Sequence, residues 1–498
     1  MCAWVFGESF DPYATMADPL AGYWDGGLGV SAANVLVAGR FAGSQALRCV
    51  SVGSATNLIK SSAANDAVHH ISVAFRQTAS LSGATLCTAL QLVDNVTGQC
   101  CVVFRSDGAI LLTSGTIAGA TLATYAGAVT ALNTWFQFEF EIIINNTTGR
   151  FRARKNGNTV DDFDSGAVLN TRPGANPYAN KLQLLNNQTN VSPQEFDDLL
   201  WRSDASSVPW VGDIRCYTRM PASDAAVQFA RSPNPALLTP FPTTVTTAHT
   251  SGNGNMVPFT APYTGTVGTL TVSVATGGTG NMKCAFYDSA RSAVVGVASN
   301  AVVNPTAGNN TVTFATPVPI VKGTLYHLAF DQDFSITYNT NTSATSGYSF
   351  TTAYASFPAA VPTTATGTAQ AQAVNCTLSI TPTVNADFVN ETLQDGTTSY
   401  VYDATVNDAD FYTIAPIAVT PISVVAVTTR GFLQKSDAGT RGAQVQMKSG
   451  ATTVGSTPTL LSSSFGWMWR TDLTDPNTSA AWTAATVNNV QIGPRVTS

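Results

Sequence analysis

The feature that most constrains this chain is residues 135–145, where apolar side chains alternate with charged or amide side chains. This period of two is typical of a β-strand with one buried face, because successive side chains of a strand point to opposite sides. Asn156-Gly157, a little further on, is a strong signal for the turn of a β-hairpin. Phe136, Phe138 and Phe140 form the apolar side of this strand. Gln137, Glu139 and Glu141 form its polar side.

Shorter segments with the same alternation recur along the chain, separated by Gly, Pro, Asn and Asp. They predict an all-β protein of several domains, each a β-sandwich or jelly roll. Two of them, at residues 196–201 and 212–219, are predicted to close the first sandwich, and Pro221 then opens a connector. The other predicted strands of this region are residues 67–77, 86–93, 100–105, 110–113, 150–155 and 182–186.

Composition narrows the classes of function. Only 11% of the 498 residues are charged, against roughly 25% in average soluble proteins, which suits subunits packed beside neighbours or a surface that meets neutral partners such as sugars. The net charge of −6 and the lack of a basic cluster exclude nucleic acid as the expected partner. We find no apolar run long enough to span a membrane, and no basic segment or apolar core of a signal peptide at the N-terminus.

The cysteine and histidine patterns indicate structural roles. The eight cysteines are scattered without a Cys-x-x-Cys motif, so we expect free thiols on buried strands and no bound metal. His69 and His70 are neighbours in a predicted strand and should point to opposite faces, which argues against a shared metal ion.

Residues 233–382 form a segment of different composition, with proline at both ends and six charged residues. Its strand-like stretches are spaced as in a small β-sandwich, which predicts an inserted domain that resembles a carbohydrate-binding module in pattern. Exposed aromatic rings beside amide and carboxylate groups are what sugar binding requires. The predicted glycan-binding residues are Tyr326, His327, Asp331, Asp333, Tyr338, Asn339 and Tyr348.

The long Phe/Glu strand, the Asn-Gly hairpin and the FDDL strand at residues 196–199 together resemble the concanavalin A-like lectin and glucanase jelly roll. Residues 8–13 (ESFDPY), 39–43 (GRFAG), 196–201 (FDDLLW) and 212–215 (GDIR) resemble a family of tailed-bacteriophage virion proteins that carry this fold. Residues 394–401, 435–441, 475–483 and 487–493 resemble the same family. The resemblance implies a jelly roll at 1–220, an insertion at 233–382, and a C-terminal β-sandwich from 221–232 plus 383–498.

An enzyme of the glucanase type would place three acidic residues at alternate positions of one strand facing the cleft. Here Glu139 and Glu141 are followed at the next such position by Ile143, so we predict no catalytic residues and no enzyme. Three acidic groups could instead supply oxygen ligands to calcium, but none has the spacing of a known calcium loop. They are Asp161 with Asp162 and Asp164, Asp197 with Asp198, and Asp331 with Asp333.

We therefore predict a structural component of a tailed-phage virion, without a cofactor, assembled in the host cytoplasm and exposed on the particle. The first hypothesis is a tail fibre, spike or baseplate-associated protein that contacts host-surface glycans. The alternative is a capsid decoration or head-fibre protein, and a third is a polysaccharide hydrolase. Expected partners are other virion proteins, copies of the chain itself in a homo-oligomer such as a trimer, and a host glycan.

Overall fold

A computed structural model describes residues 4–13, 23–26, 35–49, 57–79, 81–186, 193–231, 245–249, 251, 253–341, 348–351, 354, 357–358, 373–374, 376–391, 397, 399–417, 421 and 423–498. Nearly all regular structure there is β-strand, which confirms the predicted all-β class. Contacts divide the chain into two units, Met1–Met220 with Glu391–Gln394 and Ala404–Ser498, and Pro221–Asn390 with Asp395–Asp403. The predicted insertion at 233–382, and the C-terminal β-sandwich from 221–232 plus 383–498, stay predictions; residues 232–244 lie outside the described parts. No described helix has the length and apolar content that a bilayer crossing needs.

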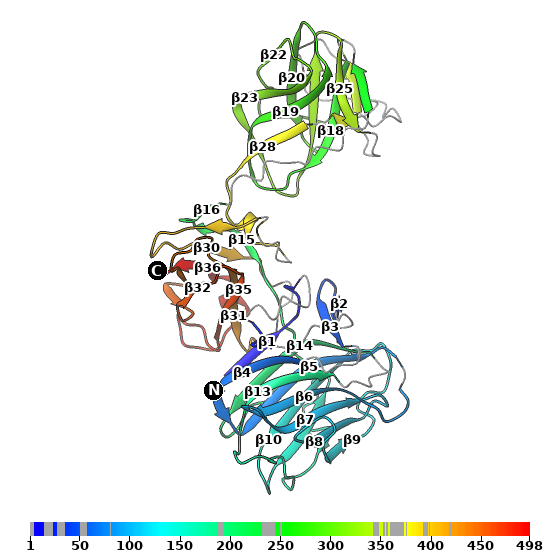
Figure 1. Ribbon diagram of the computed structural model, residues 1–498, viewed down its shortest axis with the longest axis vertical. Coiled ribbons are helices and arrows are strands. Elements are labelled where there is room, and N and C mark those ends of the chain that lie inside the picture. The colour runs from blue at the N-terminus through cyan, green and yellow to red at the C-terminus, as the bar shows by residue number, and fades with distance from the viewer. Residues whose placement is uncertain are drawn as a thin grey trace. The chain divides into compact units, whose positions relative to one another are not determined.

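The N-terminal part of the first unit is a sandwich of two antiparallel sheets, drawn as facing layers in Figure 1. In order, its eight-stranded sheet contains β12 (Phe163–Asp164), β11 (Arg150–Lys155), β10 (Phe136–Ile143), β5 (Val68–Gln77), β14 (Gln194–Asp204), β3 (Gln45–Cys49) and β2 (Val35–Ala38), with β1 (Trp4–Glu8) also beside β14. Its six-stranded sheet contains β4 (Asn57–Asp66), β13 (Ala179–Asn186), β6 (Leu86–Asp94), β7 (Thr97–Arg105), β8 (Ile110–Ser114) and β9 (Thr121–Tyr125).

The core of this sandwich lies between the two sheets and is rich in aromatic rings. Phe75 of β5 and Phe104 of β7 stack with ring centroids 4.3 Å apart, and Phe196 of β14 meets both rings edge-on at 5.4 Å. The apolar side of β10, with Phe138 and Phe140 fully buried, packs into the same core. The alternation read from residues 135–145 therefore predicts correctly which face of β10 is inside.

Local predictions around this core hold as well. Asn156 and Gly157 both adopt the positive φ that a tight turn requires, at 54° and 76°. His69 and His70 do lie on opposite faces: His69 accepts a hydrogen bond from the Trp201 indole at 3.2 Å, and His70 meets the ring of Trp210. Most of the cysteines that the structure describes are buried, as expected.

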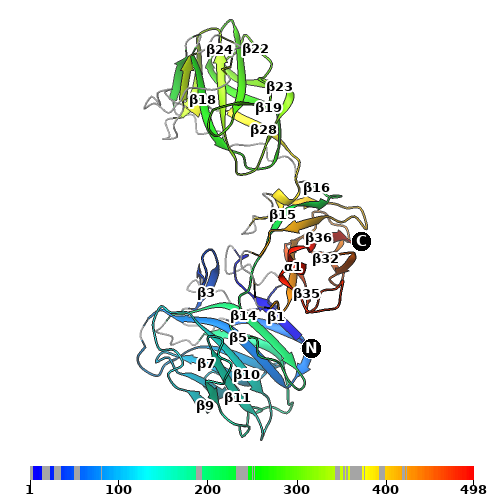
Figure 2. The same cartoon turned by 180° about the vertical axis from the view of Figure 1, so that it is seen from behind.

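The C-terminal part of the first unit has its own small core. Its strands are β30 (Phe411–Ile414), β36 (Gln491–Val496), β32 (Gly442–Ser449), β33 (Thr452–Gly455) and β34 (Thr459–Leu460), and a separate pair, β31 (Val427–Leu433) with β35 (Gly466–Asp472). The helix α1 (Ala484–Asn488), visible in Figure 2, begins with a capping box in which Thr483 and Thr486 bind each other's backbone. Met447, Trp482 and Val487 fill the core between helix and sheet.

This part is joined to the jelly roll by a cationic side chain among aromatic rings. Arg430 of β31 lies 4.3 Å from the ring of Tyr23 and 3.8 Å from the buried carboxylate of Glu8 on β1. Lys60 of β4 lies 4.4 Å from the ring of Trp469 on β35. Charges placed on aromatic faces and away from water attract those rings strongly, so these contacts fix β31 and β35 against the jelly roll.

The second unit contains the inserted sandwich, again with two sheets. One has β17 (Val245–His249), β25 (Ile336–Asn341), β19 (Gly265–Thr276) and β23 (Gly308–Ile320), together with β27 (Ala373–Val374) and β28 (Cys376–Pro382). The other has β21 (Val294–Val295), β20 (Asn281–Tyr287), β24 (Leu325–Gln332), β18 (Asn253–Thr260) and β26 (Tyr348–Thr351), together with β22 (Val302–Val303). Outside the sandwich, β15 (Pro221–Ala226) precedes a two-stranded pair, β16 (Ala230–Arg231) with β29 (Val401–Tyr402), and a short 3-10 helix spans Ala386–Phe388.

One predicted strand is wrong. Residues 212–219 do not join a sheet, and residues 205–220, which we call the capping segment, cross the polar face of the eight-stranded sheet without regular structure. Their backbone amides bind carboxylates of the sheet in place of a neighbouring strand, as Cys216 does with Asp198 at 2.7 Å. Side-chain carboxylates thus accept the backbone hydrogen bonds that a neighbouring strand would otherwise accept.

Candidate functional site under the capping segment

The polar side of β10 is where a glucanase-like cleft would lie, and the structure buries it. In the register of the sheet, Glu139 lies opposite Ser72 of β5 on one side and opposite Arg154 of β11 on the other. Glu139 is only 2% exposed. The amides of Val211 and Gly212 donate to its two carboxylate oxygens at 2.6 and 2.9 Å. Burial raises the pKa of Glu139, while these two amides lower it in part.

Glu141 lies one pleat further on the same face and is held by arginines. It accepts from the guanidinium of Arg152 at 2.5 Å, and Arg152 also reaches Asp161 at 3.3 Å. Arg154 binds the same Asp161 at 2.8 Å. The indole of Trp210 covers both guanidinium groups, with its ring 4.1 Å from Arg154 and 5.3 Å from Arg152. Glu141 is therefore part of a closed ion-pair network beneath Trp210.

His70 occupies the centre of this network in its neutral form. Burial, and after it the nearby arginines, hold the pKa of His70 well below the ordinary value of a histidine. Its Nδ1 lies 3.1 Å from a nitrogen of Arg202, which can donate to it, and 3.4 Å from an oxygen of Glu139. A neutral imidazole accepts from Arg202 and forms no ion pair with Glu139. The ring of Trp210 lies roughly perpendicular to the imidazole, with the two ring centroids 4.4 Å apart, and covers this side of His70.

These contacts decide what the face can do chemically. A general acid or base must come within hydrogen-bond reach of a substrate atom, whereas both oxygens of Glu139 are taken by backbone amides of the capping segment. The third alternate position is Ile143, as the sequence shows. The arrangement fastens the capping segment to the sheet and presents no free carboxylate from β10.

Asp197 and Asp198 are adjacent carboxylates on β14, at a point where the register between β14 and β5 shifts. Asp197 accepts from the amides of Arg40 at 2.8 Å and Asp198 at 2.7 Å. Asp198 accepts from Cys216 and has one buried oxygen, Oδ2, without a hydrogen-bond partner, 3.8 Å from Arg40. Burial raises the pKa of Asp197 to about 6, and burial together with the charge of Asp197 raises the pKa of Asp198 to about 8.

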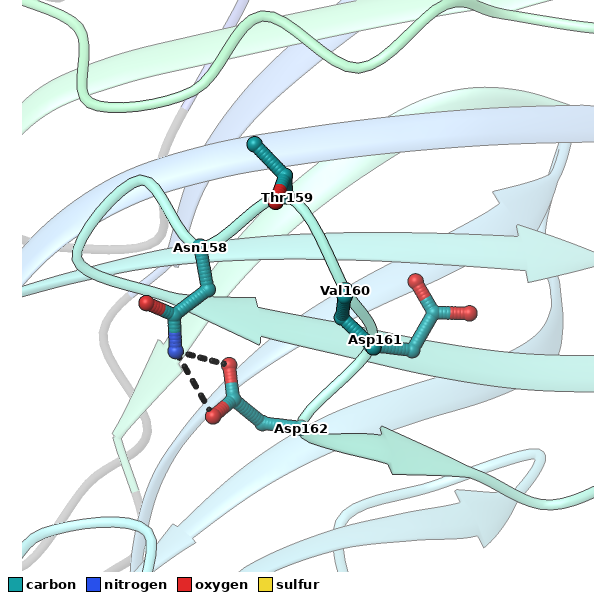
Figure 3. Close-up of a pocket in the computed structure, with 5 residues that line it drawn as sticks. All are labelled: Asn158, Thr159, Val160, Asp161 and Asp162. Carbon is teal, nitrogen blue, oxygen red and sulfur yellow. Dashed lines mark hydrogen bonds between the residues drawn. The ribbon is translucent and has the colours of Figure 1, made fainter.

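The other acidic groups named from the sequence are bound to protein partners. Asp164 forms an ion pair with Arg150, and both oxygens of Asp162 accept from Asn158 at 2.9 and 3.0 Å. Residues 158–162 line a surface hollow of about 300 Å³. Figure 3 shows the two hydrogen bonds between Asn158 and Asp162, with the Asp161 carboxylate pointing away from them. Among the described residues no three His, Cys, Asp or Glu side chains are grouped so that they could hold a metal ion.

The predicted glycan-binding residues of the insertion do not form one surface. Tyr326, His327 and Asp331 lie on β24, whereas Tyr338 and Asn339 lie on β25 in the opposite sheet. All of those with a described exposure on these two strands are buried: Tyr326 is 6% exposed, His327 4%, and Asp331 and Tyr338 0%.

The two tyrosines are core residues, which corrects their predicted role as exposed platforms. The ring of Tyr326 stacks on Phe259 at 5.7 Å, and that of Tyr338 packs on Phe330 at 6.0 Å. Burial lowers the pKa of His327, whose Nδ1 lies 3.2 Å from the Asp288 carbonyl oxygen.

Asp333 is half-buried and accepts from the amide and side chain of Asn281 at 2.6 and 2.8 Å. Asn339 lies opposite Thr246, and Tyr348 lies on β26 opposite Met256. The side chains of Asn339 and Tyr348 lie outside the described residues. Glycan binding by the inserted domain stays a prediction.

Sequence reasoning missed the residues that organise the site, namely Trp210 and Arg40. Trp210 lies between the two segments, 196–201 and 212–219, that were predicted to be strands, and no sequence pattern there indicates that its ring covers Arg152 and Arg154. Arg40 lies inside the GRFAG motif at 39–43, and its guanidinium joins Gln137, Asp213 and the carbonyl of Ile214. No local pattern predicts those distant partners.

Comparison with known proteins gives matches in structure alone. No family model matches the chain, and no curated protein is significantly similar to it. A carbohydrate esterase from the Shiga toxin-encoding bacteriophage phi24B is 13% identical and covers 40% of this chain and 100% of its own, with a TM-score of 0.28. Lectin II from Ulex europaeus is 10% identical over 41% of this chain and 100% of its own, also at 0.28. The cellulose-induced protein Cip1 is 13% identical over 41% and 100%, at 0.27.

Proposed function

We propose that this chain is a non-enzymatic structural protein of a tailed-phage virion, exposed on the particle, where it contacts host-surface glycans. Its place in the tail, as a fibre, spike or baseplate-associated protein, is the first form of the proposal, and a capsid decoration or head fibre is the alternative. The combination of virion-protein motifs in residues 1–230 and 383–498 supports a virion role. Other virion proteins and further copies of the chain are the proposed partners.

The single observation that carries the non-enzymatic part is the engagement of Glu139. Its oxygens bind two amides of the capping segment, and Trp210 closes the same face. Glu139 is buried beneath the capping segment and both of its oxygens are held by fixed amides, so it does not lie within hydrogen-bond reach of a substrate proton. This favours a binding or structural role over polysaccharide hydrolysis.

A turnover assay tests this part directly. We expect no release of reducing ends from a panel of bacterial polysaccharides by the full chain, and no change on Glu139→Gln. Glu139→Gln should instead lower the free energy of unfolding by about 1–3 kcal/mol, because an amide nitrogen then faces a backbone N–H. Turnover in the wild type that vanishes in a folded Glu139→Gln variant, but persists in Glu141→Gln, would overturn the proposal.

Labelling of intact virions tests the location. Antibody raised against residues 233–382, with gold detection by electron microscopy, should mark the tail if the first form holds. Gold over the head would select the decoration or head-fibre alternative. Absence of label on particles that contain the chain by mass spectrometry would contradict surface exposure.

A further inference from the structure

The capping segment carries an arginine in contact with two aromatic rings. The guanidinium carbon of Arg215 lies 3.9 Å from the ring centroid of Phe41 and 4.0 Å from that of Tyr217. Stacking on two rings restricts the orientation of a guanidinium, and its N–H groups can still bind a ligand. The orientation of Arg215 is therefore set before any ligand arrives.

Both rings are held by the fold. Phe41 belongs to a tight turn in which the Ser44 amide donates to its carbonyl at 3.0 Å and its own amide donates to the Ser44 hydroxyl at 3.0 Å. The neighbouring Arg40 ties this turn to the capping segment through Asp213 at 2.7 Å and the Ile214 carbonyl at 3.2 Å. The clamp around Arg215 thus joins two segments that are far apart in the sequence.

Arg215 is exposed, and among the described residues it has neither a hydrogen bond nor an ion pair. Most arginines on this side of the jelly roll differ, because Arg40, Arg152 and Arg154 are each bonded to carboxylates. The hydroxyl of Tyr217 in the same cluster is buried without a hydrogen-bond partner. The N–H groups of the exposed Arg215 are therefore the hydrogen-bond donors of this cluster that a ligand can reach.

The local charge suits an anion. Asp213 is the acid nearest in sequence, and Arg40 neutralises it at 2.7 Å, so the cluster keeps the positive charge of Arg215. A planar guanidinium matches the two oxygens of a carboxylate or phosphate, and such paired, charge-assisted bonds are among the strongest polar contacts in proteins. Aromatic rings at its sides add the apolar surface on which a sugar ring can lie.

We propose that Phe41, Arg215 and Tyr217 form a binding site for an acidic glycan, with Arg215 as the anchor for a carboxylate or phosphate on the sugar. The inference rests on the proposed function, since it names the class of glycan and the part of the chain that meets it. It moves the glycan contact from the inserted sandwich to the jelly roll.

The test measures binding of the full chain to defined probes by calorimetry at low salt. The probes are oligogalacturonate, its neutral methyl ester, and a glycerol phosphate oligomer. We expect binding to at least one acidic probe, none to the methyl ester, and weakening at about 0.5 M salt, where exposed charges are screened. Arg215→Ala should weaken binding about tenfold or more. Arg215→Lys should weaken it less, because lysine keeps the positive charge but loses the paired N–H donors of the planar guanidinium.

A matched control and a fold check make the outcome decisive. Arg441 is exposed and paired with Asp437 outside this cluster, so Arg441→Ala should bind like the wild type. Circular dichroism and the melting temperature establish that Arg215→Ala is folded. Unchanged acidic-glycan binding in folded Arg215→Ala would overturn the site and leave the proposed function standing, whereas absence of binding to any glycan, acidic or neutral, would count against both. The ratio of the dissociation constants for the uronate and phosphate probes identifies which anion the site prefers.

Discussion

Replacing Asp198 with asparagine should stabilise the protein, and more strongly as the pH rises. Asp198 is 1% exposed, and its pKa is raised from 3.8 to about 8 by burial and then by the charge of Asp197. The folded chain therefore keeps a proton that the unfolded chain releases above about pH 4. Since the folded state binds more protons across this window, the stability that Asp198 contributes is complete at low pH and is lost as the pH rises through about 8.

The magnitude follows from the same values. Each tenfold change in proton affinity corresponds to about 1.4 kcal/mol, so near neutral pH the buried Asp198 costs the folded state on the order of 4 kcal/mol relative to an exposed aspartate. Asparagine does not ionise, and its carbonyl can still accept from the Cys216 amide. It also tolerates the left-handed backbone of this position, where φ is 48°, as aspartate does, so the substitution adds no backbone strain.

Urea unfolding followed by tryptophan fluorescence gives the test, because Trp201 is fully buried in the same sandwich. The gain in free energy of unfolding from Asp198→Asn should be larger by about 3 kcal/mol at about pH 8 than at about pH 5. Asp437→Asn, at an exposed aspartate paired with Arg441, serves as the control and should not reproduce this difference. Equal gains at both pH values would show that Asp198 is not held protonated in the folded protein.

Three other outcomes are expected. Arg430→Met should destabilise the contact of β31 with the jelly roll by about 2 kcal/mol, which limited proteolysis would detect as earlier cleavage between them; an unchanged digestion pattern would contradict it. Gly98→Ala should destabilise by at least about 2 kcal/mol, because its new Cβ would lie 2.0 Å from the Gly115 carbonyl oxygen, whereas Gly268→Ala, which has open space around it, should melt like the wild type. Deletion of residues 233–382 should leave a cooperative melting transition of the first unit, and its loss would contradict the predicted domain limits.

The fold class could be predicted from sequence because period-two alternation is a local property. Phe138 and Phe140 lie in the core between the sheets and Glu139 lies on the opposite face of β10, because neighbours in a strand alternate. The same rule could have placed Tyr326 correctly, since it shares its parity with the core residues Leu328 and Phe330 on β24. The error there came from weighing side-chain chemistry above periodicity.

The capping segment could not be predicted in this way. Residues 212–219 have the alternation of a strand, and their structure is decided by acceptors that lie far away in the sequence, among them Glu139 and Asp198. Backbone amides need a partner when they are buried, and a carboxylate satisfies them as well as a neighbouring strand does. Which of the two occurs depends on tertiary structure and leaves no local trace.

The acidic residues of the eight-stranded sheet gain their role from this segment. Glu139 binds the amides of Val211 and Gly212, Asp198 binds that of Cys216, and Arg40 joins Asp213 to the sheet. A carboxylate on an open face would be hydrated and could exchange a proton with a substrate. A buried carboxylate that accepts from two fixed amides instead attaches the segment that carries those amides to the sheet. The same residue types at the same strand positions thus support catalysis or anchoring according to whether the face stays open. Here the segment that closes it also presents Arg215 outward, so a binding surface replaces the cleft.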